Sequence, residues 1–184
     1  MADYDLPKGE LMRGKRGVVM GIANQNSIAW GIASQLAAQG AELAFTYIPA
    51  MEKRVRDLAE TIGVKHLIAA EVTNDESMDA AFAQIEAAFG TIDFLVHAIA
   101  FSDKDELTGR YVETSEANFT KSLLISCYSF TAVAQRAEKL MSDGGSLLTL
   151  TYYGAEKVMP HYNVMGLAKA ALETSVQYMA EDLG

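Results

Sequence analysis

The stretch T-L-T-Y-Y-G-A-E-K-V-M-P-H-Y-N-V-M-G-L-A-K, residues 149–169, is the one around which the rest of the chain is organised. An apolar run at 144–151 predicts a strand that ends at Tyr152, and a helical pattern opens at Tyr162. Lys169 follows Tyr162 by seven residues, close to two helical turns, so both side chains can point into one pocket. A tyrosine that can donate a proton, beside a fixed cation at the edge of a sheet, predicts chemistry that needs a cofactor.

The remaining sequence predicts strands and helices in alternation. Short apolar runs predict strands at residues 15–20, 42–47, 64–70, 92–100 and 146–151. Helical patterns end at about residue 39 and cover about 50–62, 73–89, 114–141 and 160–183, with Gly40 and Gly63 ending the first two and Thr73 and Glu76 spaced as a capping box. Continuous apolar strands with helical crossovers are typical of a parallel sheet covered on both faces. We therefore predict one doubly wound, Rossmann-like α/β domain over residues 1–184, with an N-terminal arm at 1–13.

Two features of the helices extend this prediction. The chain ends on the helix 160–183, where a doubly wound fold continues into another strand, so we expect the C-terminal part of the domain to be missing after Gly184. The helix 114–141 is apolar on more than one face, which predicts both burial in the core and contact with another subunit. Its apolar residues are Phe119, Leu123, Leu124, Ile125, Tyr128, Phe130 and Val133.

Composition narrows the class of protein. A net charge of -9 argues against nucleic acid or an anionic membrane as the partner, and favours a small molecule. No leader is predicted, and no apolar run approaches the roughly 20 residues that a membrane span needs. The single Cys127 is expected to be a core residue of a reduced, cytoplasmic protein. His97 and His161 flank the predicted site without metal-ligand spacing, so neither a metal nor a catalytic histidine is predicted.

The turn after the first predicted strand, residues 21–31, is the expected position of a cofactor pyrophosphate, because the N-terminus of the next helix points there. It reads G-I-A-N-Q-N-S-I-A-W-G and lacks the G-x-G-x-x-G pattern. Gly21 can make the tight turn and Ala23 is small enough for close approach. Ser27 can cap the helix and donate a hydrogen bond to a phosphate. The turn is a weak signal by itself, because small residues often follow strands.

Two further strand ends meet at the same edge of the predicted sheet. Glu71 and Val72 could accept from an adenine amino group and pack on its ring, and Ala98–Ala100 would let a cofactor lie across the backbone. Each also fits an ordinary strand end, but with the tyrosines and the lysine they describe one groove for a dinucleotide. Residues 47–49 contain no acid for the ribose hydroxyls, so the choice between NADH and NADPH stays open.

These motifs resemble the bacterial enoyl-[acyl-carrier-protein] reductases, a divergent branch of the short-chain dehydrogenase/reductase superfamily. The resemblance covers about residues 11–184 and also includes A-E-L-A-F-T-Y, H-A-I-A-F, I-S-C-Y-S-F, L-L-T-L-T-Y-Y-G-A-E and P-H-Y-N-V-M-G-L-A-K-A. Its most specific element is the lysine at i+7 from Tyr162. Ordinary members of the superfamily have lysine at i+4, where this sequence has Gly166.

The resemblance implies reduction of the trans-2 double bond of enoyl thioesters on acyl carrier protein by NADH, in fatty acid biosynthesis, by a homotetramer. It implies that Tyr162 hydrogen-bonds the thioester carbonyl and stabilises the enolate, that Lys169 holds the nicotinamide ribose, and that Tyr152 lines the acyl pocket and assists proton delivery. Ala100 and Phe101 would contact the substrate as well. The implied cofactor-binding residues are Gly21, Ala23, Ser27, Ile28, Glu71, Val72, Ala98, Ile99, Ala100 and Lys169.

Departures from the family pattern leave alternatives open. Ile48 stands where NADH-using members often have glutamine, and Glu71 where aspartate is common, so NADPH remains an option. Family members are also longer, with a segment at the nicotinamide and a mobile helix over the substrate. A carbonyl reductase of the superfamily is one alternative, although it would have lysine at i+4 and a serine about a dozen residues before Tyr162, where Thr149 and Leu150 stand. A non-catalytic nucleotide-binding module is the other.

Overall fold

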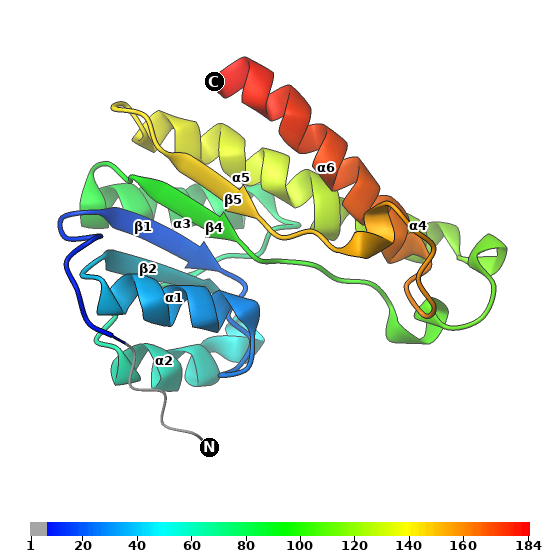
Figure 1. Ribbon diagram of the computed structural model, residues 1–184, viewed down its shortest axis with the longest axis horizontal. Coiled ribbons are helices and arrows are strands. Elements are labelled where there is room, and N and C mark those ends of the chain that lie inside the picture. The colour runs from blue at the N-terminus through cyan, green and yellow to red at the C-terminus, as the bar shows by residue number, and fades with distance from the viewer. Residues whose placement is uncertain (1–6) are drawn as a thin grey trace. The chain divides into compact units, whose positions relative to one another are not determined.

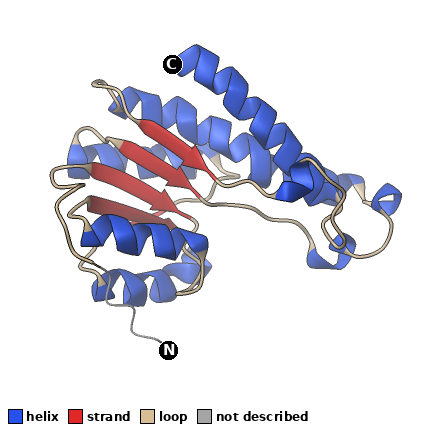
Figure 2. Ribbon diagram, viewed as in Figure 1, coloured by secondary structure: helices blue, strands red, loops and turns tan. Residues whose placement is uncertain are grey.

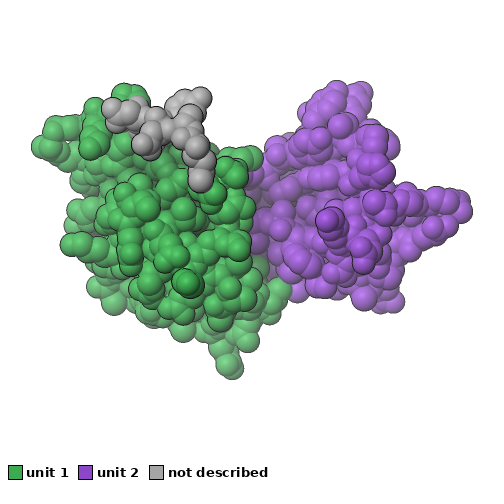
Figure 3. Space-filling model, turned by 90° about the horizontal axis from the view of Figure 1, so that it is seen from below, with its two compact units in different colours: residues 1–98, 139–148 green, residues 99–138, 149–184 purple. Residues whose placement is uncertain are grey.

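The computed structural model describes residues 7–184. The chain forms two compact units. Figure 3 shows the first unit, which runs up to Ala98 and includes Lys139–Leu148, and the second, which consists of Ile99–Glu138 and Thr149–Gly184. The assignment of residues 1–184 to a single domain stays a prediction.

The first unit contains the sheet (Figure 1). Its strand order is β3-β2-β1-β4-β5, from β1 (Arg16–Met20), β2 (Glu42–Tyr47), β3 (His66–Ala69), β4 (Phe94–His97) and β5 (Ser146–Thr149), whose last residue opens the second unit. The pairs β1–β2, β1–β4 and β2–β3 are parallel, and Val18 lies opposite both Ala44 and Leu95. These central residues are fully buried. The predicted parallel, doubly wound α/β class is confirmed.

Helices cover both faces of this sheet (Figures 1 and 2). On one face, α1 (Ile28–Ala38) and α2 (Glu52–Thr61), which follows a short 3-10 turn η1 (Pro49–Met51), share one apolar cluster with the strands. Figure 1 shows α3 (Asp75–Phe89) behind the strands. Its inward side is apolar and buried, through Met78, Ala81, Phe82, Ile85 and Phe89.

The helix ends show where local signals predict structure and where they do not. Gly40 and Gly63 adopt φ of 90° and 75° just after α1 and α2, as helix-ending glycines do. The predicted capping box is wrong, because Asn74 rather than Thr73 caps α3 by accepting from the Ser77 N–H at 2.7 Å. Thr73 instead donates to Glu71 Oε1 at 3.1 Å.

Residues 7–13 of the predicted arm lie against the end of α1, where the Gly9 N–H donates to the Ala38 carbonyl at 3.0 Å. Residues 1–6 of the arm lie outside the described part.

The second unit is helical. The helix predicted over 114–141 is a continuous helical run made of α4 (Glu116–Leu123), a π-helical turn η4 (Leu124–Tyr128), α5 (Ser129–Ala137) and the 3-10 turn η5 (Glu138–Leu140), which ends in the first unit. The last helix, α6 (Val164–Leu183), packs beside this run, and Thr131 and Ser175 are hydrogen-bonded at 3.0 Å. Short 3-10 turns η2 (Lys104–Leu107), η3 (Tyr111–Glu113) and η6 (Tyr153–Ala155) lie in the connecting loops.

Two predictions about these helices are tested by the structure. Phe130 and Val133 are buried, whereas Tyr128 is more than half exposed, so the run has both a core face and an outward apolar residue. The last helix begins at Val164 rather than at residue 160, because His161 and Asn163 have positive φ and interrupt it. Within residues 7–184, none of the helices is both long enough and apolar enough to cross a membrane.

Candidate active site

In the first unit, the turn after β1 has the backbone that its sequence predicts. Gly21 has φ of 91°, a value that side chains disfavour, so glycine makes the tight turn. Ser27 caps α1, because its Oγ accepts from the Trp30 N–H at 3.2 Å. The same hydroxyl donates to the Asn24 carbonyl at 2.8 Å, so its hydrogen is used inside the turn. The N–H groups of the first helical turn, starting at Ile28, have no partner within the helix and form an anion-binding end.

The other two predicted strand ends lie at the same edge as Gly21, because parallel strands end together. The Ala98 N–H donates to the Met20 carbonyl at 3.1 Å, which extends the β1–β4 ladder to the edge. Beyond β3, the Glu71 N–H donates to Ser77 Oγ at 3.0 Å. Glu71 and the neighbouring Val72 are half-buried, and Ala23 is exposed. The structure thus brings together the predicted cofactor residues of the first unit.

Sequence reasoning missed one residue of this edge. The guanidinium of Arg54, in α2, donates to the Ala23 carbonyl at 3.3 Å and brings a positive charge to the turn. The charge is visible in the sequence one helical turn past residue 49. The direction of the side chain is not, because it depends on how α2 packs beside the turn.

In the second unit, the two predicted tyrosines are in contact. The ring centroids of Tyr152 and Tyr162 are 4.7 Å apart, with the ring planes tilted by 60°. Tyr162 is half-buried, and the pKa of its hydroxyl is raised by burial and by the neighbouring Tyr152. A tyrosine is protonated at neutral pH, as a hydrogen-bond donor must be, and the raised pKa of Tyr162 extends the protonated range to higher pH.

Lys169 is the buried cation of this unit, with 6% of its surface exposed. Its Nζ donates to the Leu150 carbonyl at 2.7 Å, next to the end of β5, and an ammonium group has two further donors. Burial lowers the pKa of Lys169, and the half-buried Cys127 opposes this shift weakly. The pKa of the Cys127 thiol is raised by burial, which fits an inert packed cysteine.

The predicted placement of Tyr162 and Lys169 two turns apart on one helix is wrong, because Tyr162 precedes the first residue of α6. The glycines around Tyr162 give a better reason for the unusual spacing. A Cβ at Gly166 would lie 2.8 Å from the Gly154 carbonyl oxygen, and a Cβ at Gly154 would lie 2.4 Å from Tyr162 Cδ1. A lysine at position 166 would therefore collide with the backbone, so the cation has to come from elsewhere on the helix.

The segment 99–101 is tied to the helical run of the second unit. Ser126 Oγ, in η4, accepts from the Phe101 N–H at 2.9 Å and donates to the Phe101 carbonyl at 3.0 Å. Lys121 Nζ lies 4.8 Å from the centre of the Phe101 ring. Ile99 is half-buried, and Ala100 and Phe101 are exposed. Sequence reasoning missed the role of Ser126, because its pairing with Phe101 spans 25 residues.

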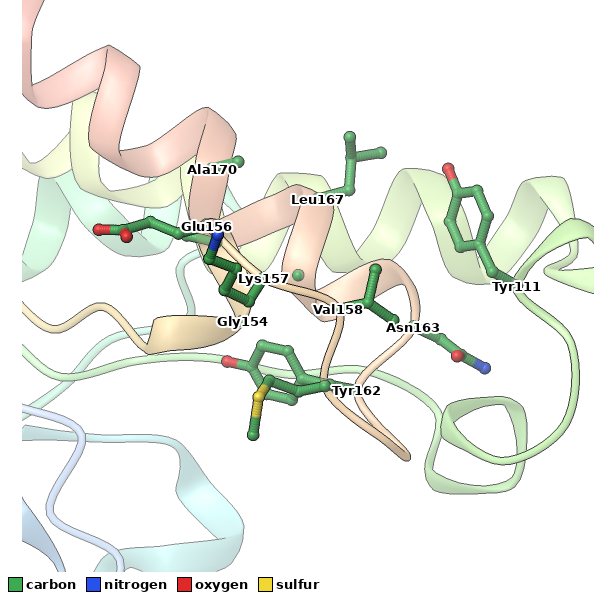
Figure 4. A pocket seen from close by; sticks show the side chains of 12 residues that line it. Tyr111, Gly154, Glu156, Lys157, Val158, Tyr162, Asn163, Leu167 and Ala170 are labelled. Carbon is green, nitrogen blue, oxygen red and sulfur yellow. The ribbon is translucent and has the colours of Figure 1, made fainter.

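A cavity of about 430 Å³ lies beside Tyr162 in the second unit (Figure 4). It is open to solvent and is lined by the loop 154–159, by the start of α6 at Gly166, Leu167 and Ala170, and by Tyr111. Its lining is mainly apolar, which suits a hydrocarbon chain. Among residues 7–184, no three His, Cys, Asp or Glu side chains gather closely enough to hold a metal ion.

The fold and these residues define a class: a doubly wound α/β protein with a tyrosine pair and a buried lysine. The family model described as Enoyl-(Acyl carrier protein) reductase matches residues 21–184, and the chain belongs to this family. The resemblance seen in its motifs is thereby confirmed.

Relatives and solved structures agree with this assignment. The chain is 63% identical over 175 residues to enoyl-[acyl-carrier-protein] reductase [NADH] 1 of Rhizobium meliloti, covering 95% of this chain and 64% of that protein. It is 57% identical to the Rickettsia bellii enoyl-[acyl-carrier-protein] reductase [NADH] FabI, covering 95% and 67%. The chain thus spans about two thirds of the length of these relatives.

Two crystal structures of enoyl-acyl carrier protein reductases are similar to the fold. The enzyme of Anaplasma phagocytophilum, in complex with NAD, has a TM-score of 0.95 at 58% identity, covering 97% of this chain and 69% of that one. The Bacillus cereus enzyme, with NADP+ and indole naphthyridinone, has a TM-score of 0.93 at 50% identity, covering 95% and 69%.

Proposed function

We propose that the protein reduces the trans-2 double bond of enoyl-[acyl-carrier-protein] thioesters with NADH, as a step of fatty acid biosynthesis. The observation that carries the proposal is the Tyr152–Tyr162 contact in a unit that also buries Lys169, with Gly166 packed where a lysine cannot fit. The family assignment supports the same reaction. Both favour it over the carbonyl-reducing and non-catalytic alternatives.

The residues present fit a nicotinamide dinucleotide. The positive φ of Gly21 and the capped N-terminus of α1 suit a pyrophosphate, and the free donors of Lys169 suit ribose hydroxyls. When bound, the cofactor supplies a hydride for C3 of the substrate. The relatives' names favour NADH, and the Bacillus cereus complex with NADP+ keeps NADPH as a second option. We assign cofactor contacts to Gly21, Ala23, Ser27, Ile28, Glu71, Val72 and Ala98 of the first unit, and to Ile99, Ala100 and Lys169 of the second.

We assign to Tyr162 the stabilisation of the negative charge that develops on the substrate. Its hydroxyl would donate a hydrogen bond to the thioester carbonyl, and this bond strengthens as the carbonyl oxygen becomes an enolate. The raised pKa of Tyr162 suits a donor that stays protonated. Tyr152, Ala100 and Phe101 would line the acyl site, and Tyr152 would assist proton delivery to C2.

Lys169 has a different task in this proposal. Its ammonium would hold the nicotinamide ribose hydroxyls and place a positive charge near the developing enolate. The bond from Nζ to the Leu150 carbonyl, 2.7 Å long, fixes the direction of the side chain before any ligand binds.

The family also implies the partner and the assembly. We infer an acyl carrier protein as the bearer of the substrate, a cytoplasmic location and a homotetramer. The exposed Tyr128 on the helical run of the second unit is compatible with a subunit contact there. Nucleic acid is disfavoured by the net charge of -9.

The test is oxidation of NADH, followed by its near-ultraviolet absorbance, in the presence of a trans-2-enoyl thioester. We expect oxidation that depends on the enoyl thioester, faster with NADH than with NADPH. A 3-ketoacyl thioester is the control for carbonyl reduction and should give none. Bound NADH without turnover of any enoyl thioester would contradict the proposal, and turnover of the ketoacyl thioester would favour the carbonyl-reducing alternative.

A further inference from the structure

Asn163, directly after Tyr162, has a backbone conformation that residues with side chains rarely adopt. Its φ is 35° and its ψ is -120°. The Met165 N–H donates to the Tyr162 carbonyl at 2.9 Å, so residues 162–165 form a turn with Asn163 in its second position. These angles are close to those of a type II′ turn, which usually has glycine there. Strained residues of this kind concentrate at functional sites, where surrounding contacts hold them.

The side chain of Asn163 supplies such a contact. It does not cap α6, which it precedes, although asparagine is a favoured capping residue. Its Nδ2 donates instead to the Glu106 carbonyl in η2 at 3.0 Å, a bond between residues 57 positions apart. Figure 4 shows the Asn163 amide and the Tyr162 ring extending in opposite directions from adjacent positions.

The acceptor of this bond is itself fixed. The Glu106 carboxylate accepts from the Ser115 N–H at 2.9 Å, from Ser115 Oγ at 2.8 Å and from Asn118 Nδ2 at 3.3 Å. Asn118 is 1% exposed, and its Oδ1 accepts from the Asp103 N–H at 2.9 Å. These bonds anchor η2 to the N-terminal end of α4. Asn163 is therefore tied to a rigid part of the second unit rather than to a free loop.

Tyr162 depends on this arrangement because its ring has little room. The residue before it, His161, has φ of 59°, so Tyr162 stands between two residues with positive φ. One side of the ring meets Tyr152 at 4.7 Å, and there is no space for a Cβ at Gly154. A small rotation of the backbone at Asn163 would move the hydroxyl or force the ring against these neighbours.

We propose that Asn163 is a positioning residue for Tyr162: its hydrogen bond to the Glu106 carbonyl holds the strained turn that aims the tyrosine hydroxyl at the substrate. The inference rests on the proposed function for the identity of that substrate. The effect of Asn163 on Tyr162 itself does not depend on the proposed function, because it can be measured without turnover.

Asn163→Gly removes the hydrogen bond without adding backbone strain, because glycine adopts φ of 35° freely but has no side-chain amide. The matched control is Asn74→Gly, since Asn74 uses only its side-chain oxygen to cap α3, and glycine is tolerated at that position. We expect Asn163→Gly to lower kcat about tenfold, the loss of one hydrogen bond to a well-placed group, with the KM for NADH nearly unchanged. Asn74→Gly should leave both within about twofold.

A double-mutant cycle with Tyr162→Phe tests whether Asn163 acts through the tyrosine. In the Tyr162→Phe background, Asn163→Gly should change kcat less than about twofold, because the hydroxyl that it aims is gone. An equal fractional loss in both backgrounds, or no loss in either, would overturn the proposal. If Asn163 had a purely structural role, Asn163→Gly would lower kcat in both backgrounds.

The second readout is the pKa of Tyr162, from the ring carbon resonances of 13C-labelled tyrosine assigned with Tyr162→Phe. Asn163→Gly should lower this pKa toward the ordinary tyrosine value, because a released ring is less buried, and Asn74→Gly should not. A Tyr162 pKa that Asn163→Gly leaves unchanged would overturn the positioning role. A pKa that moves in a protein without enoyl thioester turnover would keep the positioning role and contradict the proposed function, so the two failures are distinguishable.

Discussion

The turn after β1 and the segment 149–169 offer a ligand different kinds of group. The turn offers the backbone N–H groups at the start of α1, and its small residues Gly21 and Ala23 leave room for a ligand to approach the backbone. The segment 149–169 offers side-chain atoms, the hydroxyl of Tyr162 and the ammonium of Lys169. The first region should therefore be sensitive to added atoms. The second should be sensitive to the removal of its functional groups, and to added atoms only where its glycines are closely packed. Four substitution and pH experiments test this difference.

Among these four experiments, the largest effect is expected for Lys169→Met, which removes the cation and keeps the apolar stem. NADH should bind about tenfold or more weakly, and kcat/KM should fall by about a hundredfold, because a charge-assisted contact and charge stabilisation are lost together. Isothermal titration calorimetry measures the NADH affinity, and steady-state kinetics measure kcat/KM. Lys139→Met, on an exposed lysine, is the matched control and should change neither. Unaltered NADH affinity in Lys169→Met would show that the lysine does not contact the cofactor.

Gly166→Ala adds one methyl group to the second region and tests whether packing, as well as chemistry, fixes it. The new Cβ would lie 2.8 Å from the Gly154 carbonyl, so the loop that supports Tyr162 has to move. We expect kcat to fall about tenfold with NADH affinity unchanged, since a misplaced catalytic group affects the chemical step. Gly31→Ala, in the interior of α1 with nothing within 4 Å of its Cβ, should raise the melting temperature instead. Full activity of Gly166→Ala would show that crowding at position 166 does not explain the displaced lysine.

Gly21→Ala makes the corresponding test in the first region. Alanine at φ of 91° is strained, so we expect a loss of about 1 kcal/mol of stability and about tenfold weaker NADH binding. Gly63→Ala, at φ of 75° after α2, carries the same kind of strain away from the turn. It should cost similar stability and leave NADH affinity intact. Equal effects of both substitutions on affinity would mean that Gly21 acts only through the stability of the fold.

The smallest effect is expected from pH, and it separates the two side chains of the second region. The pKa of Lys169 is lowered, so its positive charge is lost as pH rises, beginning below the ordinary lysine value. The pKa of Tyr162 is raised, so its proton is retained to a higher pH than in an ordinary tyrosine. NADH affinity should therefore weaken severalfold at alkaline pH before kcat at saturating NADH declines. A kcat that falls first would reverse this order and contradict the assignment of the two groups.

The two regions also differ in how far the sequence could predict them. The turn after β1 follows from local signals, because an apolar strand, a glycine and a capping serine are neighbours in the chain, and the conformations of Gly21 and Ser27 confirm them. The segment 149–169 is predictable in its residue types but not in its geometry. Helix α6 begins four residues later than the pattern indicates, because His161 and Asn163 have positive φ and interrupt the helix.

Contacts between distant residues account for what the sequence did not show. The close approach of Gly154 to Tyr162, the bond from Ser126 to Phe101 and the contact of Arg54 with Ala23 each depend on tertiary packing. The π-helical turn η4 lies within the helix predicted over 114–141, and residue periodicity did not distinguish it from the flanking α-helices. Periodicity and capping residues report on neighbours along the chain, whereas these contacts join residues that are far apart in the sequence.

The most direct test of the account is Tyr162→Phe, which removes a single oxygen atom from the proposed site. We predict that kcat with an enoyl thioester falls about a hundredfold or more, as for loss of one donor to a developing oxyanion, while NADH binds within about twofold of the unmodified protein. Tyr178→Phe, on an exposed tyrosine of α6, is the matched control and should be indistinguishable from the unmodified protein. Turnover of the enoyl thioester by Tyr162→Phe at the unmodified rate would contradict the central claim.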